Sequence, residues 1–115
     1  MEESMKMVQT VYQALEEKKG EAIRVLDISR ISVLADYFVI TNGTSDSQVT
    51  ALVDNVEGKM QGAGYALRQQ EGSGKESWVL LDYGDVIVHI FDKESRPFYD
   101  LERIWSDGVL VEMEG

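Results

Sequence analysis

The stretch that decides the fold is Trp78-Val79-Leu80-Leu81-Asp82-Tyr83-Gly84-Asp85-Val86-Ile87-Val88-His89-Ile90-Phe91. Two apolar runs rich in β-branched and aromatic residues flank one short polar turn, a pattern typical of paired strands. The glycine between two carboxylates allows a tight reversal, so the segment is predicted to form a β-hairpin. Trp78, Tyr83 and His89 give this hairpin groups that favour partial exposure or a hydrogen-bond partner.

Upstream of the hairpin, the pattern predicts two helices and three strands. Apolar residues recur at helical spacing over 4–19, with Ser4 as a possible cap and Gly20 as a stop. Ser45 and Gln48 form a capping box that opens a second helix, which runs to about residue 61. Runs of apolar and β-branched residues predict three strands, at 21–28, 36–41 and 65–68.

Downstream, Pro97 interrupts any helix begun at 93–96, and residues 99–105 are expected to form a short helix on the sheet. The tail from Val109 to Met113 carries apolar residues among acids and could dock on the sheet or on a second subunit. The fold class expected is α/β (α+β): one domain with a mixed five-stranded sheet and helices packed on it.

Composition narrows the class of protein further. A chain of 115 residues with 43% hydrophobic residues is expected to form a single domain, here 1–115, with one core. The absence of cysteine excludes disulfides, thiolate catalysis and cysteine-bound zinc. No apolar window is long enough to cross a membrane and no secretory signal is present, so a cytoplasmic protein is expected.

The charge indicates the kind of partner. Twenty-one acids against 11 bases give a net charge of -10, which disfavours binding to nucleic acid or to anionic membranes. A basic protein partner fits this charge. The charge could equally serve solubility alone.

Several segments together resemble the Iojap family, the ribosomal silencing factors of bacteria and organelles. The hairpin carries Asp82-Tyr83-Gly84-Asp85 with His89 four residues later, and the other matching pieces are Leu26-Asp27-Ile28, Ala35-Asp36-Tyr37-Phe38-Val39-Ile40, Gly43-Thr44-Ser45, Arg96 and Phe98-Tyr99-Asp100-Leu101-Glu102-Arg103-Ile104-Trp105. The resemblance covers about residues 5–107 and leaves 108–115 as a tail beyond the shared pattern.

The resemblance implies a mechanism without covalent chemistry. Similar proteins bind the fourteenth protein of the large ribosomal subunit, which is basic, and block joining of the small subunit. Translation then falls under starvation or in stationary phase. The resemblance also implies a possible homodimer, and no cofactor or metal. In organelles, the same contact looks more like an assembly safeguard.

By position in the family pattern, the resemblance suggests a set of partner-binding residues. Trp78 and Tyr83 are expected to be contact residues because a strand start beside a glycine-rich loop and a turn are hard to bury fully. The full set is Trp78, Leu80, Asp82, Tyr83, Asp85, His89, Arg96 and Tyr99.

Two alternatives stay open. The family is similar in fold to nucleotidyltransferases, and Gly43-Thr44-Ser45 at a helix entrance could bind phosphate or simply cap the helix. The acidic pair that should follow such a turn closely is missing, because Asp92 and Glu94 lie about fifty residues on, so the fold is expected without its active site. An adaptor that binds another basic protein, or one for ribosome assembly, is the second alternative.

Overall fold

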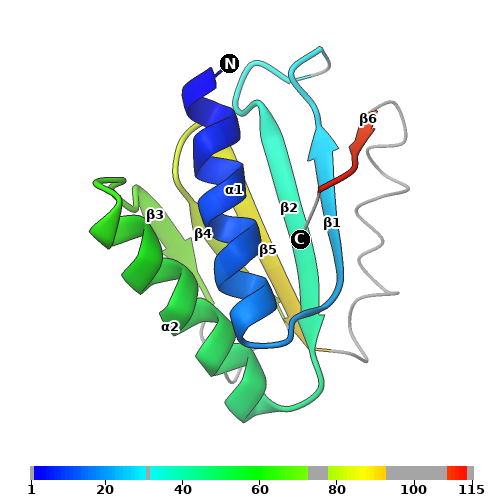
Figure 1. Ribbon diagram of the computed structural model, residues 1–115, viewed down its shortest axis with the longest axis vertical. Coiled ribbons are helices and arrows are strands. Elements are labelled where there is room, and N and C mark those ends of the chain that lie inside the picture. Colours follow the sequence, from blue (N-terminus) through cyan, green and yellow to red (C-terminus); the bar gives the residue numbers. More distant parts are fainter. Residues whose placement is uncertain (1, 31, 73–77, 93–108, 114–115) are drawn as a thin grey trace.

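Both helices lie on one face of a single mixed sheet (Figure 1). The computed structural model describes residues 2–30, 32–72, 78–92 and 109–113. Within these ranges the helices are α1 (Glu2–Glu17) and α2 (Asp46–Gly62). The strands are β1 (Glu21–Asp27), β2 (Tyr37–Gly43), β3 (Gln69–Glu71), β4 (Trp78–Asp82), β5 (Val86–Asp92) and β6 (Val109–Val111).

The sheet has the strand order β3-β4-β5-β2-β1-β6. β2 and β5 run parallel at its centre, and the other neighbours are antiparallel. All seven residues of β2 are buried, as expected for a strand covered on both faces. The predicted hairpin is confirmed: β4 and β5 pair with Trp78 opposite Phe91 and Asp82 opposite Ile87. The α/β class of fold is thereby confirmed.

Two predictions about the strands need correction. The described sheet has six strands rather than five, because the tail forms β6 and pairs with β1. The strand expected at 65–68 lies instead at Gln69–Glu71. Tyr65 cannot begin a strand because its amide donates to the carbonyl of Met60 and so completes the end of α2.

The ends of α1 also differ from the prediction. The helix begins at Glu2, so Ser4 lies inside it and is not its cap. The buried Ser4 hydroxyl donates to the Asp36 carboxylate at 2.7 Å and ties α1 to the start of β2. At the other end the helix stops before Gly20, the predicted stop, and Lys19, with φ of 60°, adopts the left-handed conformation that ends it.

The second helix follows its predicted pattern closely. Ser45 is its N-cap and accepts from the Gln48 amide at 3.1 Å. The preceding strand extends beyond its predicted end at residue 41, because Asn42 and Gly43 belong to β2. The inner face of α2 consists of buried apolar side chains: Val49, Leu52, Val53, Val56 and Met60.

The core has two layers, one on each face of the sheet. Between the sheet and the helices, Val39, Val88 and Ile90 pack with the inner faces of α1 and α2. On the opposite face, Phe38 and Phe91 are buried in a smaller cluster completed by Leu26, Ile28, Ala35 and Ile40. The helix predicted over 99–105 lies outside the described residues.

Candidate functional site

The register of the hairpin separates its side chains into two sets. Val79 and Leu81 are fully buried toward the helices. Trp78, Leu80 and Asp82 alternate with them and therefore lie on the opposite face, each half-buried. Their neighbours on β5 are Phe91, His89 and Ile87 respectively. The structure thus brings together four of the eight predicted contact residues: Trp78, Leu80, Asp82 and His89.

Trp78 and His89 form a hydrogen-bonded aromatic pair. The indole Nε1 of Trp78 donates to Nδ1 of His89 at 3.1 Å, and the ring centroids lie 5.6 Å apart. His89 also meets the Phe38 ring edge-on with 4.6 Å between centroids. Because an indole N–H only donates, Nδ1 must be the unprotonated nitrogen and Nε2 carries the hydrogen.

His89 is buried and neutral, contrary to the expectation of a contact residue. Only 3% of it is exposed, and burial lowers its pKa to about 3. Its Nε2 has no hydrogen-bond partner among the described residues. The expectation failed because strand alternation shows only the face on which a residue lies, and here that face is itself a core. His89 therefore holds Trp78 in place from beneath the surface.

The structure also corrects the expectation that Tyr83 is hard to bury. Although it occupies the turn, only 6% of it is exposed, and its ring packs with the core on the helix side. Burial, and next the nearby Glu57 carboxylate, raise the pKa of Tyr83 to about 12. A turn residue can be buried here because the turn folds over α2, so Tyr83 and Trp78 belong to opposite faces of the sheet.

The acids of the turn have distinct structural partners. The Asp82 carboxylate accepts from the Gly84 amide at 2.7 Å, which shapes the turn where Gly84 has φ of 89°. The backbone carbonyl of Asp85 accepts from the amides of Asp36 and Tyr37 at 2.8 and 3.1 Å. The Asp85 side chain itself is exposed. The remaining predicted residues, Arg96 and Tyr99, lie outside the described residues.

Side chains occupy the turn that could have bound phosphate. The Gln48 side-chain oxygen accepts from the Thr44 amide at 2.6 Å and from its hydroxyl at 2.8 Å. The Gln48 side-chain nitrogen donates to the carbonyls of Lys18 and Lys19 at 3.2 and 2.8 Å. Ser45 caps the Gln48 amide, so these contacts describe a helix cap that also joins the two helices.

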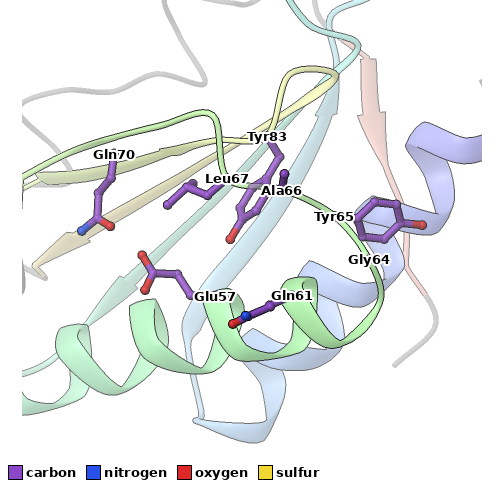
Figure 2. Close-up of a pocket in the computed structure, with 8 residues that line it drawn as sticks. All are labelled: Glu57, Gln61, Gly64, Tyr65, Ala66, Leu67, Gln70 and Tyr83. Atoms are coloured by element: carbon purple, nitrogen blue, oxygen red, sulfur yellow. The ribbon is translucent and has the colours of Figure 1, made fainter.

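Sequence reasoning missed a pocket of about 710 Å³ on the helix side (Figure 2). Its lining comes from the second half of α2, the segment that follows it, β3 and the hairpin turn. The position of Glu57 in the sequence could have indicated this pocket. Glu57 is an acid that neighbours the buried apolar residues Val53 and Met60 at helical spacing on α2. The lining residues are Glu57, Gln61, Gly64, Tyr65, Ala66, Leu67, Gln70 and Tyr83.

Two kinds of feature are absent from the described residues. No group of three or more histidine, cysteine or carboxylate side chains in these ranges could hold a metal ion. None of the described helices is both long and apolar enough to span a membrane.

Comparisons with known proteins agree on one family. The sequence matches the family described as "Ribosomal silencing factor during starvation" over residues 1–115. It is similar to the ribosomal silencing factor RsfS of Halalkalibacterium halodurans, with 38% identity over 97% of this chain and 96% of that protein. It is also similar to the chloroplastic Iojap protein of Zea mays, with 32% identity over 96% of this chain and 48% of that protein.

A solved structure supports the same grouping. The crystal structure of a Chromobacterium violaceum protein superposes with a TM-score of 0.86 and 32% identity, over 96% of this chain and 89% of that one. The name that these relatives carry, ribosomal silencing factor, describes a regulator of translation. The sequence match and the shared fold together show that this chain belongs to the ribosomal silencing factor family.

Proposed function

We propose that this protein represses translation by binding the large ribosomal subunit through its fourteenth protein and blocking the small subunit sterically. The family match over residues 1–115 carries the proposal. The relatives' name, ribosomal silencing factor, fits this activity. The proposed place of action is the cytoplasm, and the proposed mechanism uses no catalysis, cofactor or metal.

The proposed contact surface is the sheet face of the hairpin. Trp78 and Leu80 supply half-buried apolar area there, and a hydrogen bond fixes the orientation of Trp78. Aromatic anchors held rigidly in this way commonly dominate the binding energy of an interface. We include Arg96 and Tyr99 in the same proposed contact, on the family pattern.

Charge supports a basic partner at this surface. Asp82 and Asp85 stand at the hairpin turn, and the whole chain has a net charge of -10. Carboxylates at the rim of an apolar contact steer a cationic partner and fix its register. Direct contact with RNA backbone would meet repulsion from the same charge.

His89 and Tyr83 take a different role in this proposal from the one that the sequence indicated. Both are buried, so we propose that they position the hairpin rather than touch the partner. His89 accepts from Trp78, and Tyr83 anchors the turn to the core beside α2.

The proposal also includes a homodimer. β6 is the last strand in the order of the described sheet, and Val109 and Leu110 on it are 56% and 55% exposed. An exposed apolar edge strand is a ready surface for pairing with a second copy. Sedimentation velocity of the purified protein tests this: a single species of monomer mass at high concentration would contradict it.

Co-sedimentation with purified large subunits tests the contact. Trp78→Ala should weaken binding by about tenfold or more, because a rigid aromatic anchor is lost. Asp85→Lys should also weaken binding and should leave the fold intact, because the Asp85 side chain is exposed. Glu112→Lys, the same charge reversal at an exposed position next to β6, is the matched control and should bind like the wild type. Wild-type affinity in both hairpin variants would contradict the proposed surface.

A further inference from the structure

The pocket on the helix side lies on the other side of the sheet from Trp78, so, apart from Tyr83, its lining is separate from the residues of the proposed ribosomal contact. Its volume of about 710 Å³ falls in the range of small-ligand sites. In Figure 2 the Tyr83 hydroxyl and the Glu57 carboxylate both point into the space between α2 and the segment 64–70.

The Tyr83 hydroxyl is the first observation that points to a ligand. The residue is 6% exposed, and its hydroxyl has no hydrogen-bond partner among the described residues. A buried hydroxyl without a partner destabilises the fold, so native proteins rarely keep one without a reason. A ligand group that reached this hydroxyl by displacing the lining side chains above it would supply the missing hydrogen bond.

The charge of the lining is the second observation. Glu57 is half-buried and is the one charged residue among the lining side chains that the structure describes. Asp54 lies one turn earlier on α2, and burial followed by Asp54 raises the pKa of Glu57. The lysine of α2, Lys59, forms an ion pair with Glu17 of α1 instead, with 3.6 Å between Lys59 Nζ and Glu17 Oε1. A positive group in the pocket would therefore relieve a carboxylate for which the described part of the chain provides no cation.

The polar groups of the lining also suit a ligand rich in N–H donors. Gln61 and Gln70 contribute amide oxygens from opposite sides of the pocket, on α2 and β3. Leu67 and Ala66 supply apolar surface for an aliphatic chain. An anion such as phosphate would face Glu57, and the lining residues that the structure describes include no arginine or lysine to offset the repulsion. Arg68, in the same segment, lies against Gly84 of the hairpin turn instead.

We propose that this pocket binds an alkyl guanidinium or ammonium group, with its cation against Glu57 and an N–H donated to the Tyr83 hydroxyl. Such a group occurs both in free small amines and in arginine or lysine side chains of another protein. Agmatine, a free amine with a guanidinium at one end and an ammonium at the other, represents the first source. A capped arginine amide, which carries the guanidinium alone, represents the second.

Titration of the whole protein with agmatine, followed by NMR at low salt, tests the proposal. Shifts should concentrate at the lining residues and saturate with a dissociation constant on the order of 1 mM or tighter. Glu57→Gln should weaken binding about tenfold, because a charge-assisted hydrogen bond is lost. Glu71→Gln removes one exposed acid from the neighbouring strand β3 and should leave the affinity within about twofold.

Tyr83→Phe distinguishes a tyrosine that binds the ligand from one that only supports the fold, because stability and affinity should change in different ways. Its denaturation midpoint should stay equal to the wild type or rise, because an unsatisfied hydroxyl is removed. Its affinity for agmatine should fall by about threefold or more. Ala66→Phe, which fills the pocket from an exposed position, should abolish binding without unfolding the protein.

Three results would overturn the assignment. These are no saturable shifts with either cation, equal affinity in Glu57→Gln and the wild type, or tighter binding of inorganic phosphate than of agmatine. If the capped arginine amide binds as well as agmatine, the site takes a protein side chain. If agmatine alone binds, it takes a free amine.

Discussion

His89 illustrates how one buried group links stability to the surface. Its ring is neutral, and its contacts are the hydrogen bond from Trp78 and the rings of Phe38 and Phe91. Keeping a histidine neutral at low pH costs folding free energy, because the unfolded chain can take up a proton that the folded chain refuses. The same burial fixes the orientation of Trp78, which the proposed contact requires.

The stability of the protein should therefore depend on pH through His89. Its folded pKa of about 3 lies below the ordinary value of 6.5, so the unfolded state binds more protons between these values. The free energy of unfolding therefore keeps its full value above about pH 6.5 and decreases as the pH falls toward 3. The free energy of unfolding should be about 2 kcal/mol lower at pH 5 than at pH 7.

Urea denaturation of the wild type and of His89→Phe at several pH values measures this effect. A phenyl ring fits among Phe38, Trp78 and Phe91 but cannot take up a proton. Since His89 is the only histidine of the chain, the variant should show a nearly flat stability between pH 5 and 7. An unchanged slope in the variant would assign the pH dependence to other groups.

At the residue scale, the sequence alone did not give the depth of the side chains. Alternation along β4 puts Trp78 and Leu80 on one face, and the register observed in the structure pairs Leu80 with His89. Burial of His89 depends on Phe38 from β2, about fifty residues earlier in the chain. Tyr83 was misjudged for a similar reason, because α2 covers the turn.

The junction of the two helices depends on one side chain. Gln48 accepts from Thr44 ahead of α2 and donates to the carbonyls of Lys18 and Lys19 at the end of α1. It thus satisfies backbone groups at both helix termini, which would otherwise lack partners. Gly20 lies at the same junction, where an added Cβ would come within 2.8 Å of the Thr41 hydroxyl.

Removing the Gln48 side chain should destabilise the whole fold. Gln48→Ala loses the hydrogen bonds to both helix ends, and we expect a cost of about 1–2 kcal/mol. Gln13→Ala, at an exposed position within α1, is the matched control and should cost less than about 0.5 kcal/mol. Thermal or urea denaturation measures both. Equal stability of the two variants would show that the junction contributes little.

Elements with local signals were predictable, and elements that depend on distant partners were not. The hairpin and the Ser45 cap of α2 are short patterns, and both are confirmed. The other half of the predicted capping box differs, because the Gln48 side chain accepts from the Thr44 amide rather than from that of Ser45. β6 is a strand only because it pairs with β1, more than eighty residues away in the sequence. The misplaced third strand reflects a competition in which Tyr65 completes α2 instead of joining the sheet.

The whole molecule presents two different faces. Figure 1 shows both helices on one side of the sheet, and the pocket with Tyr83 and Glu57 lies there. The other side carries Trp78 and Leu80, the surface proposed to meet the ribosome. Because the sheet separates the two, occupation of the pocket and binding at the hairpin can be measured independently. The net charge of -10 favours cationic partners for both.

The joining of purified ribosomal subunits, followed by light scattering, tests the central claim most directly. The protein is mixed with large subunits, small subunits are added, and the extent of joining is recorded against protein concentration. We predict that joining decreases to a constant low level as the concentration of the wild type or of the Glu112→Lys control rises. Trp78→Ala should require a concentration about tenfold higher or more for the same inhibition of joining. Undiminished joining at concentrations that saturate the large subunit with wild-type protein would contradict steric silencing.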